Sequence, residues 1–109
     1  MMKYYEMLKK NGDFFAKAFD IARDVKKRAR ELFRECEVFI VGSFARGDHK
    51  LSSDLDILIV SDSIPERLRF EEYCEIVKKI AEDPRINIHL LSRSKFHEYE
   101  SLYRERIEV

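Results

Sequence analysis

The sequence predicts an α/β domain, in which a small three-stranded mixed sheet is flanked by helices. Three short apolar runs have the length and composition of buried strands, at residues 37–41, 55–60 and 86–91. Stretches with helical periodicity separate them, giving the order α-β-α-β-α-β-α. Because the chain has 109 residues, we expect one domain over 1–109, with its core at about residues 14–100.

The N-terminal part is predicted to form two helices. A short helix over residues 3–10 should end at Asn11-Gly12, a typical stop signal. A long helix should then run from about residue 14 to 36, with Asp24 and Arg28 spaced for an ion pair on its solvated face. Its buried face is predicted from apolar residues at three- and four-residue steps: Phe15, Ala18, Ala22, Val25, Ala29, Leu32 and Cys36.

The connections between the strands predict the pairing in the sheet. The short connection between the first two strands favours antiparallel pairing. A helix opened by Ser63-Ile64-Pro65-Glu66 and running to about Glu82, with Tyr73, Ile76, Val77 and Ile80 facing inward, permits a parallel crossover to the third.

Alternation in the third strand places Asn87 and His89 on one face and the apolar residues Ile86, Ile88 and Leu90 on the other. Ser92 is predicted to cap a last helix that runs to about Tyr99.

Composition excludes several classes of function. The chain has 21 basic and 21 acidic residues, and this balance argues against a general nucleic-acid or membrane-surface binder. Neither a membrane-spanning apolar run nor a signal-peptide core is present in the sequence, so we expect a cytoplasmic protein. Cys36 and Cys74 lie far apart and are predicted to be buried thiols on helix faces.

The stretch GSFARGDHKLSSDLD, residues 42–56, joins the first two strands and carries the candidate chemistry. Asp54 and Asp56 should project from one face of a strand, and two close carboxylates stay ionised readily beside a cation such as Mg²⁺ or Mn²⁺. Gly42 allows close approach to the backbone, while Ser43 and the amides of a short helix can bind an anion. Arg46 either reaches that anion or pairs with Asp48. Together they predict a site for a metal-bound nucleoside triphosphate.

Each half of this pattern alone is commonly structural, since a Gly-Ser turn is ordinary and Asp-x-Asp often caps a strand. A P-loop is excluded because Gly-x4-Gly-Lys-Ser/Thr is absent. A zinc site is not indicated, since His49, His89 and His97 lack ligand spacing.

The spacing of two motifs is similar to the signature of the DNA polymerase β-like nucleotidyltransferases. The Gly42-Ser43 pair is followed, after ten residues, by Asp54-Leu55-Asp56. The neighbouring residues, including Ser53, resemble those of the minimal nucleotidyltransferases (MNT). The resemblance implies a nucleotidyltransferase fold, with the Gly-Ser pair, Arg46 and Ser53 near the nucleotide and the aspartates on divalent metal. It also implies a role as the antitoxin of a HEPN/MNT pair, whose partner is a helical ribonuclease toxin that some members adenylylate on tyrosine.

The chain departs from that family on the third strand, which usually supplies a third carboxylate. Asn87 is the matching position and the expected third metal ligand, although an amide can neither accept a proton nor supply charge. His89 is either a substitute proton acceptor or a structural histidine.

Three functions follow. The first is metal-dependent transfer of AMP from ATP, or of NMP from another NTP, to a hydroxyl of a partner protein. The second is an antitoxin that neutralises its HEPN partner by binding alone. The third, transfer to a small molecule or an RNA end, is weakened by the neutral charge and by the lack of a second domain in the sequence. The sequence does not determine the oligomeric state, and a homo-oligomer is one of the alternatives.

Overall fold

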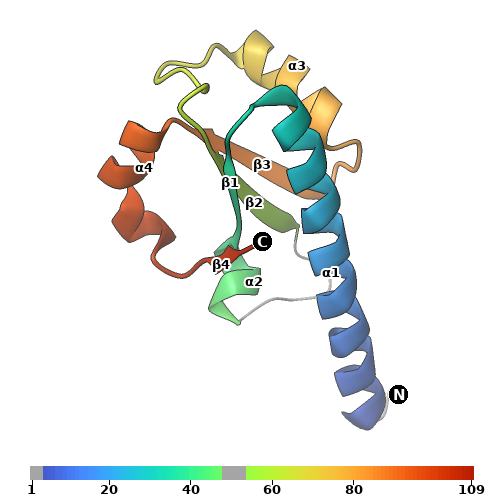
Figure 1. The fold of residues 1–109 in the computed structure, drawn as a ribbon. Coiled ribbons are helices and arrows are strands. Elements are labelled where there is room, and N and C mark those ends of the chain that lie inside the picture. The colour runs from blue at the N-terminus through green and yellow to red at the C-terminus, as the bar shows by residue number, and fades with distance from the viewer. Residues whose placement is uncertain (1–3, 48–53) are drawn as a thin grey trace.

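The computed structural model describes residues 4–47 and 54–109, with side chains from residue 16 onward. Its elements are shown in Figure 1. In chain order they are α1 (Tyr4–Leu32), β1 (Glu37–Val41), α2 (Gly42–Arg46), β2 (Leu55–Val60), α3 (Phe70–Ile80), β3 (Ile86–Leu91), α4 (Arg93–Glu98), the 3-10 helix η1 (Glu100–Tyr103) and β4 (Ile107–Glu108).

The strands form one mixed sheet in the order β3-β2-β1-β4. β1 and β2 are antiparallel, and β2 and β3 are parallel, so both predicted pairings are confirmed. The predicted number of strands is wrong, because β4 adds a fourth, antiparallel to β1. With only two residues it lacks the apolar run that would reveal a strand. It ties the C-terminal segment to the sheet.

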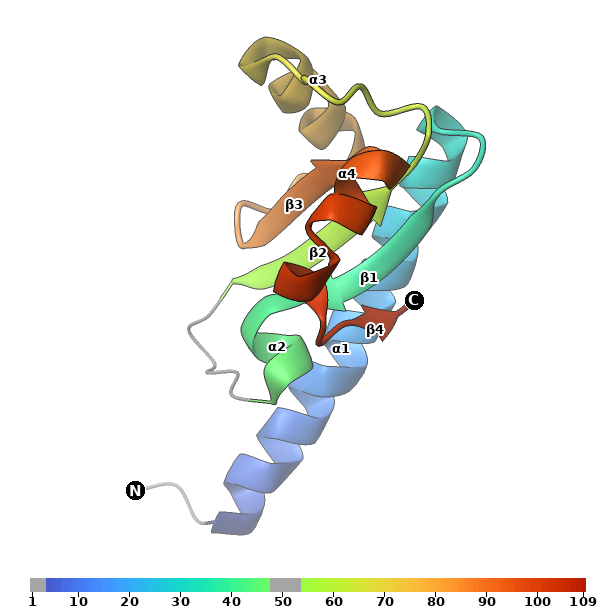
Figure 2. The same ribbon diagram turned by 90° about the vertical axis from the view of Figure 1, so that its left-hand side faces the viewer.

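The two faces of the sheet have different partners. The first face carries the larger core, in which Val38, Ile57 and Ile88 pack with the apolar side of α1 and with Ile80 of α3. The second face carries Phe39, Val41, Leu58 and Val60, which pack with Phe96 of α4. Figure 2 shows α1 behind the sheet and α4 in front of it. Because α4 and η1 are short, this second face is covered only in part.

Two predictions about the N-terminal helix, its break at Asn11-Gly12 and its C-terminal end, are wrong. α1 runs without a break through Asn11-Gly12, since one helical glycine costs about 1 kcal/mol, which the turns on either side offset. It ends at Leu32 rather than Cys36. Leu32 is exposed, and Phe33 enters the core in its place. Ala18, Ala22, Val25 and Ala29 are buried as predicted.

The helix predicted from Ser63 begins later, at Phe70, and ends at Ile80. The reason lies in the segment before it. The Ser61 hydroxyl donates to the Glu35 carbonyl and accepts from the Ser63 amide, and Ile64 is inserted into the core. These tertiary contacts hold the chain in a turn where the capping pattern favoured a helix. At the start of α4, the Ser92 hydroxyl accepts a hydrogen bond from the Lys95 amide and so caps the helix, as predicted.

The two cysteine thiols differ in how far they are buried. Cys36 is buried, as predicted, but beyond the end of α1, and burial raises the pKa of its thiol. Cys74 lies on α3 and is half-buried. The predicted Asp24–Arg28 ion pair is present at 3.4 Å.

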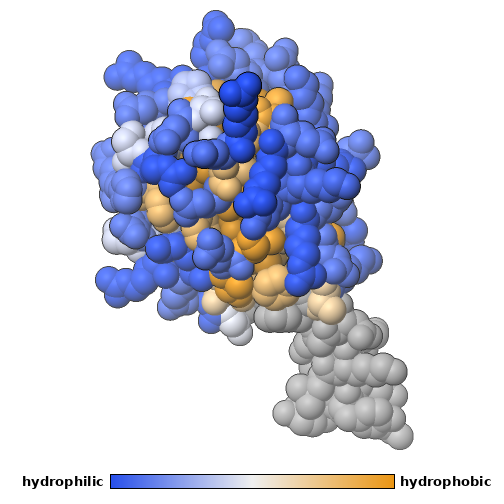
Figure 3. Space-filling view, in the orientation of Figure 1, coloured by the Kyte–Doolittle hydropathy of each residue, from blue (hydrophilic) through white to orange (hydrophobic). Residues whose placement is uncertain are grey.

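Charged side chains cover most of the surface. Figure 3 shows a mainly hydrophilic face, with apolar residues gathered in a band between α4 and α1. Over residues 4–47 and 54–109, the structure contains no helix with the length and apolar character needed to cross a membrane.

Candidate active site

The candidate site lies where β1 ends and β2 begins. Antiparallel pairing puts Asp56 opposite Val41, the last residue of β1, and Gly42 follows directly. Leu55 and Ile57 point into the larger core, so Asp56 projects from the opposite face. Asp54 is exposed at the same edge, and the Asp56 side chain retains 27% of its exposure. The prediction that two buried strands meet at these carboxylates is confirmed.

Gly42 is in direct contact with the second carboxylate. Its φ is +73°, in the region that favours glycine, and a Cβ built there would lie 2.3 Å from Asp56 Oδ2. Both the backbone conformation and the space therefore require glycine. α2 begins here without a side-chain cap. It ends at Gly47, whose amide donates to carbonyls of the same turn.

The third strand brings two side chains to the carboxylates. Asn87 pairs with Asp56 in the register, and its amide nitrogen lies 3.4 Å from Asp54 Oδ2. Nε2 of His89 lies 3.4 Å from Asp56 Oδ1. The structure therefore gathers Asp54, Asp56, Asn87 and His89 on one face of the sheet, as the alternation predicted.

Tyr103 is a neighbour of the site that the sequence analysis missed. Its ring makes an edge contact with His89, with centroids 6.2 Å apart. Burial, and secondarily the charge of Asp56, raise the pKa of its phenol. Its position depends on Arg106, which stacks over the rings of Phe39 and Phe96 and donates to the Tyr103 carbonyl. No local sequence pattern indicates such an arrangement.

A cavity of about 260 Å³ adjoins Gly42. It is lined by Gly42, Arg46, Ser101, Leu102, Arg104 and Glu105. Two guanidinium groups thus border the turn that was predicted to hold phosphates. Ser43 is half-buried within α2. Ser53, the remaining predicted nucleotide contact, lies outside the described residues.

The donor set suits a hard divalent cation. Two carboxylates and an amide oxygen are the ligand types that Mg²⁺ and Mn²⁺ prefer, and Mg²⁺ commonly takes only one or two carboxylates together with substrate phosphates and waters. Among residues 4–47 and 54–109, no group of three or more His, Cys, Asp and Glu side chains is arranged around one point. An open pair beside a glycine turn leaves room for oxygens from a ligand.

Comparison with known proteins agrees with this geometry. The family described as "Nucleotidyltransferase domain" matches residues 22–109. A relative from Methanocaldococcus jannaschii, named "Putative protein adenylyltransferase MJ1215", is 36% identical over 67 residues, which are 59% of this chain and 78% of the relative. Protein adenylyltransferase MntA of Thermococcus cleftensis is 45% identical over 53 residues, 46% of this chain and 54% of the relative.

Two solved structures share the fold. A protein from Sulfolobus solfataricus described as a "putative nucleotidyltransferase" superimposes with a TM-score of 0.67 at 20% identity, covering 86% of this chain and 80% of its own. A second structure with that description gives a TM-score of 0.62 at 26% identity, covering 80% of this chain and 95% of its own.

Proposed function

Because the chain belongs to the nucleotidyltransferase domain family, we propose that it transfers AMP from ATP to a hydroxyl of a partner protein in a metal-dependent reaction. The observation that carries the proposal is the close contact between Gly42, at the turn into α2, and the carboxylate of Asp56. The relatives named as protein adenylyltransferases support a protein acceptor. Asp54 and Asn87 are exposed and the Asp56 side chain is exposed in part, which leaves the carboxylates accessible to a macromolecule.

The reaction forms one bond and breaks one. The acceptor oxygen attacks the α-phosphorus, the bond from that phosphorus to the bridging oxygen breaks, and pyrophosphate leaves. Gly42 and Ser43 hold the phosphates on one side of the carboxylates, and Arg46 and Arg104 border the adjoining cavity with positive charge. In this reaction His89 would accept the proton of the acceptor hydroxyl at Nδ1, since its Nε2 lies 3.4 Å from Asp56 Oδ1 and donates to that carboxylate.

Asp54, Asp56 and the Asn87 amide oxygen would hold Mg²⁺ or Mn²⁺. Such an ion, when bound, offsets the charge of the phosphates and of the leaving pyrophosphate. Ligation by Asn87 requires its amide to turn, because its nitrogen faces Asp54 in this structure.

A specific observation favours a second function, neutralisation of a helical HEPN toxin by contact alone. The third strand supplies Asn87 and His89 at the positions that face the carboxylates, and neither carries a fixed negative charge. A slow or inactive enzyme with an intact fold would still present the same surface to a partner. In both functions the chain is an MNT-type antitoxin.

Thermal unfolding with and without Mg²⁺ and ATP tests nucleotide binding. Ligands that bind only the folded state raise the melting temperature, so the pair of ligands should raise it together. Asp54→Asn combined with Asp56→Asn should abolish that rise. Glu31→Gln with Asp62→Asn, which removes two exposed charges elsewhere, should keep it. An unchanged rise in the first double variant would refute the metal assignment.

Transfer is tested with ATP labelled at the α-phosphate and a helical HEPN protein from the same genome as the acceptor. The expected product is that protein with one added AMP, formed by the parent and absent with the double variant. If no AMP is transferred, yet the parent and the double variant both suppress the partner's ribonuclease activity, the function by contact replaces the enzymatic one.

A further inference from the structure

The segment that follows α4 crosses the face of the sheet that carries the carboxylates. Figure 2 shows it, in dark red, passing in front of the sheet between α4 and β4. Residues of this segment line the cavity beside Gly42, and its Tyr103 ring packs against the sheet and contacts the ring of His89. The segment therefore borders both the cavity and the carboxylate site.

Two contacts bear on the orientation of His89. The residue lies on β3, an edge strand of the sheet, and its side chain is 40% exposed. Its Nε2 lies 3.4 Å from Asp56 Oδ1, which is long for a hydrogen bond and restrains the ring only weakly. The Tyr103 ring meets the imidazole edge-on, at an interplanar angle of 68°. Because the hydrogen bond is weak, the aromatic contact sets the orientation of the imidazole and with it the direction of Nδ1.

Arg106 joins the segment to the sheet. Its guanidinium donates to the Tyr103 carbonyl at 2.9 Å and to the Glu100 carboxylate at 3.3 Å. The same group lies over the rings of Phe39 and Phe96, at 5.5 and 5.1 Å from their centroids. These two rings belong to β1 and α4 and stack on each other, 5.8 Å apart. One side chain thus connects η1 with both the sheet and the helix that covers it.

The middle of the segment has little else to fix its path. α4 is anchored at one end by the buried Phe96, and β4 is anchored at the other by its pairing with β1. Residues 99–105 between them are mostly exposed. Backbone with few buried apolar contacts opens readily. The stacking and the hydrogen bonds of Arg106 therefore restrain the segment at the point where burial restrains it least.

We propose that Arg106 is a positioning residue for the transfer reaction, which acts through Tyr103 to hold the imidazole of His89 with Nδ1 turned to the acceptor hydroxyl. This inference rests on the proposed function and adds to it a residue that acts through its neighbours alone. Without the guanidinium, the Tyr103 ring withdraws and the imidazole rotates out of line with the acceptor. A displacement of about 1 Å in a reacting group can lower a rate by about 10²-fold.

Substitutions of Tyr103 separate the effect of its ring from that of its hydroxyl. Tyr103→Phe retains the ring contact, so kcat for transfer of labelled AMP to the HEPN acceptor should stay within about threefold of the parent. Tyr103→Leu removes the aromatic edge and should lower kcat by about 10–100-fold, with the KM for ATP changed by less than about twofold. Equal losses of kcat in the two variants would assign the effect to the hydroxyl and refute a positioning role.

Arg106→Met keeps a long apolar side chain and removes the guanidinium. We expect kcat to fall by about tenfold or more. Added to Tyr103→Leu, it should lower kcat by less than about a further twofold, since both changes act on one contact. Fully additive losses would exclude the route through Tyr103. If Arg106→Met does not fold, Arg106→Lys takes its place with the same expectations, because lysine lacks the planar fork that bonds the carbonyl and the carboxylate together.

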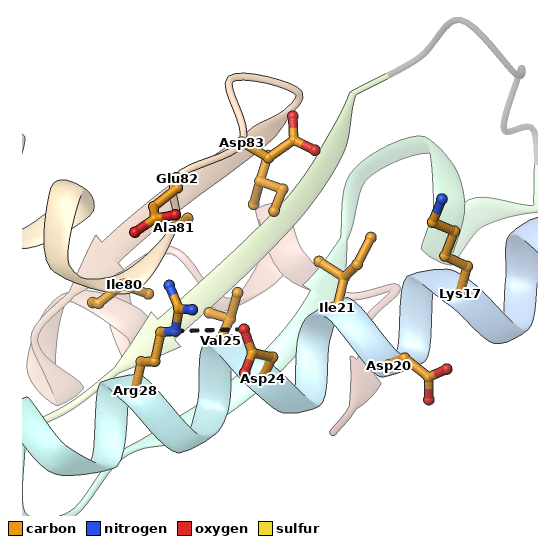
Figure 4. Close-up of a pocket in the computed structure, with 11 residues that line it drawn as sticks. Lys17, Asp20, Ile21, Asp24, Val25, Arg28, Ile80, Ala81, Glu82 and Asp83 are labelled. Atoms are coloured by element: carbon orange, nitrogen blue, oxygen red, sulfur yellow. Dashed lines mark ion pairs between the residues drawn. The ribbon is translucent and has the colours of Figure 1, made fainter.

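Two other arginines supply matched controls. Arg93 joins the start of α4 to Glu37 and Asp62, at the end of the sheet away from the carboxylates. Arg28 pairs with Asp24 on α1, which covers the opposite face of the sheet (Figure 4). Arg93→Met and Arg28→Met make the same change in charge as the test variant and should keep kcat within about threefold of the parent. A loss in either control as large as that in the test variant would mean a general effect of charge or stability and contradict the proposal.

NMR spectroscopy tests the orientation of His89 in the absence of ATP and metal. In the parent, the ring protons of His89 and Tyr103 should show a nuclear Overhauser contact, since the two rings meet edge-on. The contact should persist in Arg93→Met and be weakened or lost in Arg106→Met. The ring-proton shifts of His89 in Arg106→Met should also move toward those in Tyr103→Leu. An Overhauser contact and shifts that Arg106→Met leaves unchanged would overturn the proposal.

The positioning inference and the proposed function fail in different ways. If the parent and Arg106→Met transfer AMP equally well, the positioning role is refuted and the transferase stands. If the parent transfers no AMP, the proposed function is refuted, and the NMR comparison alone decides whether Arg106 holds His89 through Tyr103.

Discussion

Replacement of Gly42 by alanine tests the contact on which the site depends. The alanine must adopt a φ of +73°, which costs about 1–2 kcal/mol for a residue with a Cβ. In addition, its Cβ would lie 2.3 Å from Asp56 Oδ2, so the carboxylate must leave its present rotamer at a further cost of roughly 0.5–1.5 kcal/mol. The free energy of unfolding should therefore fall by roughly 1.5–3.5 kcal/mol.

Gly47→Ala is the matched control. Gly47 has a φ of +79°, but a Cβ there would meet nothing within 4 Å. Gly47→Ala therefore shares the backbone cost of a positive φ with Gly42→Ala, but it lacks the steric clash with Asp56. Urea unfolding of both variants should thus show Gly42→Ala to be less stable than Gly47→Ala by roughly 0.5–1.5 kcal/mol. In thermal unfolding, Gly42→Ala should melt roughly 7–15 °C below the parent.

A double-mutant cycle assigns the difference to its cause. Shortening the side chain with Asp56→Ala should remove most of the extra penalty of Gly42→Ala, giving a coupling of roughly 0.5–1.5 kcal/mol. Gly42→Ala should also lose the stabilisation by Mg²⁺ and ATP, because the displaced carboxylate is one of the proposed metal ligands. Equal penalties at the two glycines, with no coupling to Asp56 and full stabilisation by ligand, would refute the geometry described for the turn.

Three further predictions concern single side chains. Ser43→Ala should weaken binding of a non-hydrolysable ATP by about 1 kcal/mol or somewhat more, the scale of one hydrogen bond to a charged group, as titration calorimetry would measure; unchanged affinity would make the Gly-Ser turn purely structural. Asn87→Asp should speed transfer of labelled AMP, and Mn²⁺ should help the parent more than the variant; a brisk parent rate that the variant leaves unchanged would mean that the third ligand lies elsewhere. Asp83 has a lowered pKa, chiefly because Arg85 donates to its carboxylate, so its contribution to stability is present above the ordinary pKa and disappears as pH falls below about 4. NMR titration of Arg85→Ala should show the Asp83 pKa returning upward, and an unmoved pKa would exclude Arg85 as the cause.

The strands could be predicted from the sequence because burial on both faces leaves a continuous apolar run, as in Ile57–Val60. Their pairing followed from connection length alone. The element boundaries that failed depend on distant contacts. The turn at Ser61 is held by the Glu35 carbonyl, far away in sequence, and this bond overrides the capping pattern at Ser63.

The same distinction applies to the site. The convergence of Asp54, Asp56, Asn87 and His89 follows from alternation and a parallel register, both of which a sequence expresses. Tyr103 could not be found that way. It reaches His89 because Arg106 holds the C-terminal segment against two aromatic rings on the sheet, and that path is set by tertiary packing alone.

In β3, different residues contribute to the packing of the core and to the candidate active site. Ile88 is buried and ties β3 to the core, whereas Asn87 is exposed and contributes one long hydrogen bond to Asp54. A change at Asn87 therefore alters charge at the site with little effect on packing, since an exposed polar side chain adds little to stability. It follows that this scaffold can carry an active or an inactive site with the same outer surface. A partner that contacts only this outer surface would be held equally well in either state, so loss of transfer and loss of partner binding are separable by substitution.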